Sequence, residues 1–190
     1  MRDVAIIGWG QTPASRQAAD SEVLLLYTAI DAALDVAGLG RRDIGFTVSG
    51  SCDYLTGGPF AFVTNLEAAG AWPPISESHV EMDGAWALYE AWVRLQLGDV
   101  DTALVFGSGK SSPTDPAHLY PQQLDPYLLQ PLGVDPVSLA GLQARALLDA
   151  GKATEADFAA VVARSRRAAR NNPNAQLSGN VDAAELLNEP

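Results

Sequence analysis

Two kinds of apolar pattern alternate along positions 4 to 107 of the chain. Short uninterrupted apolar runs are typical of buried strands, and apolar residues at every third or fourth position are typical of a helix with one buried face. The expected strands are 4–7, 46–48, 75–82 and 102–107, and the expected helices are 22–37, 60–69 and 85–97. Strands that alternate with helices predict an α/β fold with a largely parallel sheet and right-handed crossovers.

Residues at the ends of the first expected helix support its boundaries. Ser21 is a good N-cap, and Gly38 is a good helix stop. The helix at 85–97 carries apolar residues on nearly every side. We therefore expect that helix to be buried on every side.

The hydrophobic pattern of the chain changes after the last expected strand. Six prolines lie between positions 111 and 136, without a sustained hydrophobic period, and predict an excursion loop. Helices are then expected at 137–150, 155–170 and 183–187. Thr154 and Asp157 have the spacing of a capping box at the start of the second of these.

Composition predicts a globular protein. The 190 residues are 47% hydrophobic and 18% charged, and the net charge of −11 argues against a nucleic-acid partner. No apolar run reaches the ~18 residues of a membrane span, and the first expected strand begins close to Met1. We therefore expect no membrane segment, no signal peptide and a cytoplasmic protein.

The chain has one cysteine, Cys52, and two histidines, which excludes a disulfide framework and disfavours a structural zinc site. Cys52 is either a nucleophile with a histidine nearby in space or a small, half-buried side chain without a chemical role. The sequence leaves both interpretations open.

Two glycine-rich turns resemble nucleotide-binding loops without meeting their requirements. The turn Gly8–Gly10 lacks the third glycine of a dinucleotide fingerprint, because Pro13 occupies that position. The turn at 107–112 is followed by prolines, where a phosphate-binding loop needs a helix. We therefore expect neither a nucleotide cofactor nor a metal in this chain.

The segment from Glu77 to Asp83 carries the most informative polar residues. Glu77, His79 and Glu81 alternate along an expected strand and therefore share one face. They form either a polar subunit interface or an acid–base site at the end of a strand. Asp83 is either the N-cap of the next helix or a further reactive group.

Four of the chain's twelve basic residues lie close together near position 167. They are Arg164, Arg166, Arg167 and Arg170. They form either a solvated helix face or a site for an anionic ligand.

Three stretches of the sequence together resemble a known family. They are the opening VAIIGWGQT at 4–12, the helix–strand unit from 84–88 through 98–105, and RRAARNNPNAQ at 166–176. The chain resembles the N-terminal half of the thiolase superfamily, in its lipid-transfer, sterol-carrier-type branch. The resemblance covers essentially the whole chain.

This resemblance implies a five-layered αβαβα fold built from two similar halves. Residues 1–112 would form the N-terminal half of the core and residues 113–190 a helical loop domain, and the second half of the core would lie outside this chain. A last helix that stops at Pro190 fits such a half-chain. The family also implies a homodimer, joined through the strand from Ser76 to Met82, that acts on coenzyme A thioesters.

The nucleophilic cysteine of that family would fall between Glu81 and Asp83, where this chain has no cysteine. The resemblance is therefore closest to the cysteine-lacking aldolases that cleave steroid side chains, which split a β-hydroxyacyl-CoA and work with a zinc-ribbon/OB-fold partner. On this basis Glu81, His79 and Asp83 are the candidate catalytic residues, with further groups expected in the second half. Arg164, Arg167 and Arg170 are the candidate ligands of the coenzyme A phosphates. A non-catalytic acyl-CoA or lipid carrier is the alternative function, and a conventional thiolase is the third.

Overall fold

The computed structural model describes residues 1–53, 60, 62–70, 76–81, 83–110 and 115–188. The chain divides into two compact units, one made of residues 1–12 and 17–114, the other of residues 13–16 and 115–190. The assignment of residues 1–112 to a core half and 113–190 to a loop domain stays a prediction. Each unit is described by itself.

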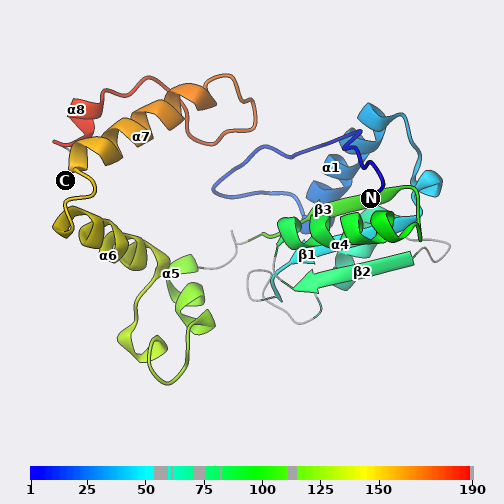
Figure 1. The fold of residues 1–190 in the computed structure, drawn as a ribbon, viewed down its shortest axis with the longest axis horizontal. Coiled ribbons are helices and arrows are strands. Elements are labelled where there is room, and N and C mark those ends of the chain that lie inside the picture. The colour runs from blue at the N-terminus through cyan, green and yellow to red at the C-terminus, as the bar shows by residue number, and fades with distance from the viewer. Residues whose placement is uncertain (54–59, 61, 71–75, 82, 111–114, 189–190) are drawn as a thin grey trace. The chain divides into compact units, whose positions relative to one another are not determined.

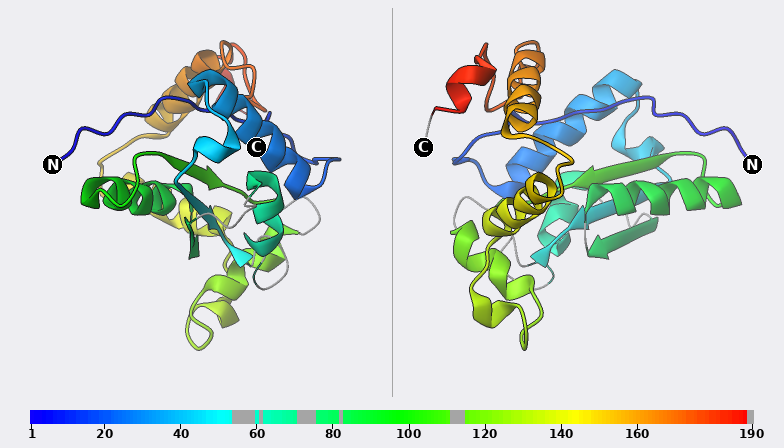
Figure 2. Two further views of the ribbon diagram at one scale, coloured as in Figure 1. Left: turned by 90° about the vertical axis from the view of Figure 1, so that its right-hand side faces the viewer. Right: turned by 60° about the vertical axis from the view of Figure 1, so that its left-hand side comes forward.

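The first unit is a small parallel sheet covered by helices on both faces (Figure 1). Its sheet has the order β2-β1-β3, and both pairings are parallel. The two views of Figure 2 show α4 on one side of the sheet and α1 on the other. The elements of this unit are α1 (Glu22–Ala37), the 3-10 turn η1 (Arg41–Asp43), β1 (Phe46–Ser51), α3 (Phe62–Ala69), β2 (Ser76–Glu81), α4 (Gly84–Leu97) and β3 (Ala103–Gly107). The predicted α/β class and parallel sheet are confirmed.

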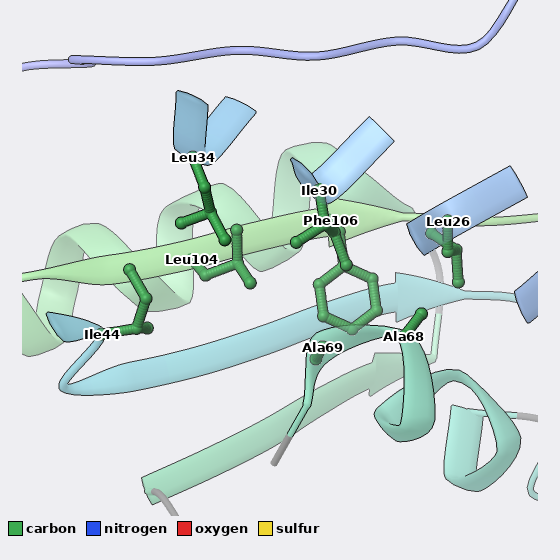
Figure 3. Close-up of a cluster of buried hydrophobic side chains, with 8 residues drawn as sticks. All are labelled: Leu26, Ile30, Leu34, Ile44, Ala68, Ala69, Leu104 and Phe106. Atoms are coloured by element: carbon green, nitrogen blue, oxygen red, sulfur yellow. The ribbon is translucent and has the colours of Figure 1, made fainter. Parts of the chain in front are cut away.

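The larger hydrophobic core lies between the sheet and the helices α1 and α3. Figure 3 shows side chains of α1 pointing toward those of β3, with two alanines of α3 beside them. The core consists of Leu26, Ile30, Leu34, Ile44, Ala68, Ala69, Leu104 and Phe106. A smaller cluster on the opposite face joins Phe46 and Val48 of β1 to Ala87 and Ala91 of α4. Burial of these side chains holds both layers to the sheet.

Helix α1 begins and ends where the sequence predicts. The hydroxyl of Ser21 accepts a hydrogen bond from the backbone N–H of Leu24, 3.2 Å away. At the other end, Gly38 adopts a φ of 67°, which a residue without a Cβ reaches at little cost. The capping box of Thr154 and Asp157 is also present, at the start of the helix α7 (Glu155–Ala169).

The prediction of a first strand at 4–7 is wrong. These residues have no strand partner among the described residues, and their side chains are exposed, with Ile6 at 77%. The segment instead passes α1 at very close range, because Gly8 and Gly10 have no side chain to keep it away. A Cβ at Gly8 would collide with the carbonyl oxygen of Ala33, and one at Gly10 with that of Ala29.

The prediction that the third helix is buried on every side is also wrong. In α4, Ala87 and Ala91 are buried, while Trp86 and Tyr89 are 51% and 57% exposed. One face of the helix packs on the sheet, and the large side chains of the opposite face are exposed. The strand predicted at 46–48 continues to Ser51, because β2 and β3 flank β1 on both sides.

The second unit is helical. It contains α5 (Pro116–Leu119), the 3-10 turns η2 (Tyr120–Gln123) and η3 (Gln130–Leu132), α6 (Pro136–Asp149), α7 and α8 (Ala183–Leu186). The proline-rich stretch thus forms short turns, apart from residues 111–114, which lie outside the described residues. Asp115 and Asp135 each cap a helix whose first residue is a proline. Among the described helices, none is long and apolar enough to cross a membrane.

Candidate functional site

A chain of hydrogen bonds joins the middle strand of the sheet to its neighbour at His79. The register pairs Ser49 of β1 with His79 of β2, so the two side chains stand next to each other on the same face. Ser49 Oγ lies 2.9 Å from His79 Nδ1, and His79 Nε2 lies 3.3 Å from Glu81 Oε2. The chain therefore runs from Ser49 through both ring nitrogens to a carboxylate.

The imidazole of His79 is held by an aromatic ring as well as by these hydrogen bonds. Phe62, at the start of α3, stacks on it with 4.2 Å between ring centroids and 10° between ring planes. The side chain of His79 is 13% exposed. Both ring nitrogens are engaged, so His79 forms the inner part of the site.

Glu81 is the outer end of the chain. Its side chain is 52% exposed, and its Oε1 accepts a hydrogen bond of 2.8 Å from the backbone N–H of Asp53. Asp53 in turn accepts a hydrogen bond from the backbone N–H of Phe60, 2.7 Å away, so Phe60 is also connected to this site. A carboxylate that accepts two hydrogen bonds and still faces solvent can take a proton from a bound molecule.

Asp83 is the N-cap of α4. Its Oδ1 accepts hydrogen bonds from the backbone N–H groups of Ala85 and Trp86, at 2.9 and 3.2 Å. The structure therefore shows the capping function that the sequence suggested, and it brings His79 and Glu81, but not Asp83, into one hydrogen-bonded chain of described residues. A catalytic function of any of the three stays a prediction.

Three glycines let α4 begin directly against the sheet. A Cβ at Gly50 would collide with the carbonyl oxygen of Asp83, and the Cα of Gly84 lies 3.5 Å from where a Cβ of Gly107 would stand. This close approach places the start of α4 beside the carboxyl ends of β1 and β3, which is where α/β proteins bind ligands.

A second polar cluster is centred on Asn65 of α3 and was not predicted from the sequence. Asn65 is 1% exposed, and its Nδ2 donates to Ser108 Oγ at 2.7 Å and to Glu22 Oε1 at 3.2 Å. Ser49 and Phe62 were not predicted either. The available signal was the run of hydroxyl side chains in β1, at positions where a strand buried on both faces is expected to be apolar.

The remaining candidate residues are Cys52 and three arginines. Cys52 directly follows β1 and is half-buried. Arg164, Arg167 and Arg170 belong to the second unit and are exposed, and Arg170 donates to Asn180 Oδ1 at 3.2 Å. Within the described ranges, no three His, Cys, Asp or Glu side chains gather closely enough to hold a metal ion.

Comparison with solved structures shows the fold of the chain. It matches a chain described as an "Ltp2-ChsH2(DUF35) aldolase" with a TM-score of 0.72 and 22% identity. The match covers 98% of this chain and 48% of that one, so this chain spans about half the length of the aldolase chain. No protein-family model matches, and no curated protein matches. At this identity the likeness establishes a shared mixed α/β fold.

Proposed function

We propose that this chain supplies the N-terminal half of a thiolase-like enzyme that cleaves a carbon–carbon bond in a coenzyme A thioester, as an aldolase. The observation that carries the proposal is the match, over 98% of this chain, to a chain described as an aldolase. The substrate we propose is a β-hydroxyacyl-CoA with a steroid or similar lipid group, on the basis of the sequence resemblance.

Glu81 is the group we propose as the general base. Its carboxylate takes the proton of the β-hydroxyl, and the bond between the α and β carbons breaks as the β carbon becomes the carbonyl of a ketone. The electron pair of that bond moves to the α carbon as a thioester enolate, which takes up a proton to give the shorter acyl-CoA. His79 donates its Nε2 proton to Glu81 and holds the carboxylate in place, 3.3 Å away. Donors that stabilise the enolate are expected in the second half of the enzyme.

The sequence supports cleavage without an acyl-enzyme. None of Glu81, Met82 and Asp83 is a cysteine, so the thiolate of a conventional thiolase is missing from that part of the chain. Met82 itself lies outside the described residues. Retro-aldol cleavage needs a base and donors to the enolate, and it needs no thiolate.

Three further features belong to the same proposal. Arg164, Arg167 and Arg170 bind the phosphates of coenzyme A. Two copies of the protein pair through β2, and a zinc-ribbon/OB-fold protein is the partner of the complex. The matched structure bears a two-component name, Ltp2-ChsH2, which is a reason to assay this protein together with whatever co-purifies with it.

The decisive experiment incubates the complete protein and its co-purifying partner with a β-hydroxyacyl-CoA that bears a steroid ring. Mass spectrometry follows the products. Release of a ketone and a shorter acyl-CoA, without added coenzyme A, would support the aldolase. Tight binding of unchanged substrate would identify a carrier, and cleavage that requires free coenzyme A would identify a thiolase; either result would overturn the proposal.

A matched pair of variants tests the base. Glu81→Gln removes the carboxylate and should lower kcat about 10²- to 10⁴-fold, the usual contribution of a general base. Glu67→Gln makes the same change at an exposed glutamate of α3, outside the hydrogen-bonded chain, and should leave kcat within about threefold of wild type, because it leaves the proton-accepting group intact. Equal effects of the two variants would exclude Glu81 as the base.

A further inference from the structure

We propose that Ser49 is a positioning residue that holds His79 in one ring orientation and one tautomer, with the ring proton on Nε2 and directed at Glu81. This inference deepens the proposed function and rests on it for its catalytic meaning. The observations behind it are the two hydrogen bonds that lead from Ser49 through His79 to Glu81, and these do not depend on the proposed function.

Ser49 is more deeply buried than His79 and Glu81. It lies in the middle strand, paired with His79 on one side and with Phe106 on the other, and it is 1% exposed. Thr47 and Ser51 occupy the same face of β1, and their hydroxyl oxygens are buried without a hydrogen-bond partner among the described residues. Of these three hydroxyls, the one opposite His79 is therefore the one that makes the contact.

The two ends of the chain select the tautomer of His79. Oε1 of Glu81 accepts a hydrogen bond from the backbone N–H of Asp53, and in a carboxylate both oxygens are acceptors. A neutral imidazole next to Oε2 must then carry its proton on Nε2, since the opposite tautomer would place a lone pair against the carboxylate. The lone pair on Nδ1 needs a donor, and the hydroxyl of Ser49 supplies one at 2.9 Å.

Ser49 also fixes the orientation of the ring. Stacking on Phe62 fixes the plane of the imidazole. It does not fix which edge of the ring faces Ser49, because a half-turn about the Cβ–Cγ bond returns the ring to the same plane. Turning the ring over about its Cβ–Cγ bond exchanges Nδ1 with a carbon and breaks both hydrogen bonds at once. Without Ser49, the bond to Glu81 is the remaining one, and at 3.3 Å it is long.

The test reads the ring of His79 directly, by NMR of the complete protein carrying ¹⁵N-labelled histidine. The chain has two histidines, so His118→Gln assigns the signals. In the wild type we expect Nε2 to be protonated and Nδ1 to accept a hydrogen bond. A neutral ring with its proton on Nδ1 would overturn the proposal without any variant.

Ser49→Ala should speed the exchange of the Nε2 proton with solvent about tenfold or more, because the ring is no longer locked. Ser51→Ala is the matched control, since it removes the same atom from the same face of β1, and it should leave the His79 signals unchanged. Ser49→Thr keeps the hydroxyl and should restore slow exchange. Unchanged His79 signals in a folded Ser49→Ala protein would overturn the proposal.

The catalytic consequence is measured separately. If the aldolase activity is found, Ser49→Ala should lower kcat about tenfold with KM nearly constant, because substrate contacts are untouched. If no activity is found while the NMR signals behave as expected, the positioning of His79 stands and the proposed function fails. Altered kcat with unaltered His79 signals would overturn the positioning function instead.

Discussion

Gly50 lies where the middle strand passes the start of α4, and a Cβ there would collide with the carbonyl oxygen of Asp83. The atoms that a Cβ would meet are backbone atoms at the start of α4, which cannot rotate away as a side chain can. Gly50→Ala should therefore push α4 away from the sheet and cost about 3 kcal/mol of unfolding free energy. Urea unfolding measures the loss.

Gly107→Ala is the control for this substitution. The added Cβ would meet Gly84 Cα at 3.5 Å, an ordinary contact, so this variant should lose less than about 1 kcal/mol. Equal losses in the two variants would show that the collision at Gly50 is relieved at no cost.

At the level of single residues, the sequence predicted two of the three residues of the hydrogen-bonded chain. His79 and Glu81 stand out because they are polar, alternate, and lie in a strand. Ser49 and Phe62 do not stand out, because their contacts with His79 depend on the strand register and on where α3 docks. Neither of these follows from residue spacing along the chain.

The cap of α4 separates a structural from a chemical function of Asp83. Asp83→Ala removes the acceptor for two backbone N–H groups and should destabilise the protein by about 1 kcal/mol. Asp83→Asn keeps a capping oxygen and should retain most of that stability. Thermal unfolding compares the two variants. A large loss of turnover in a stable Asp83→Asn protein would instead assign Asp83 a chemical function.

The start of α7 should weaken in acid. Hydrogen bonds from the side chain and the backbone of Thr154 hold the pKa of Asp157 below its ordinary value of 3.8. Because the folded pKa is the lower one, this bond stabilises the helix above pH 3.8 and is lost as the pH falls through the folded pKa. Circular dichroism between about pH 5 and pH 2 should show this loss of helix, which Asp157→Asn should diminish.

Thr154→Ser and Thr154→Val test the cause. Serine keeps the hydroxyl that donates to Asp157 Oδ2 at 2.7 Å, so the acid transition should remain. Valine removes the donor, and the transition should shrink. The assignment would be wrong if the valine variant kept the wild-type pH dependence.

Among the secondary-structure elements, those with local signals were predictable. The helix α1 has a cap, a period and a stop in its own sequence, and it was predicted to the residue. The expected strand at 4–7 had an equally clear apolar run but needs a neighbouring strand to pair with, and the described residues supply none. The prediction that α4 is buried on every side was wrong for a related reason. A helix that is apolar on all sides indicates that another element packs on it, but the pattern does not identify that element.

For the molecule as a whole, charge decides where an anionic substrate can bind. The net charge of −11 on this chain repels phosphates such as those of the proposed coenzyme A thioester, so a site for them needs a local excess of positive charge. The chain concentrates such an excess at the end of α7, at Arg164 and Arg167 in the helix and at Arg170, its C-cap, whose side chains are exposed. Replacing all three by glutamine should weaken binding of a coenzyme A thioester about tenfold or more.

A charge-matched control separates local contacts from the overall field. The control replaces three exposed arginines elsewhere by glutamine, namely Arg16, Arg42 and Arg145. Both triple variants change the net charge from −11 to −11 − 3 = −14. Isothermal titration at about 0.05 and 0.5 M salt should show a large loss for the α7 variant and a small one for the control, since distant charges are screened beyond ~10 Å. Equal losses would place the phosphate site away from α7, because only the net charge would then matter.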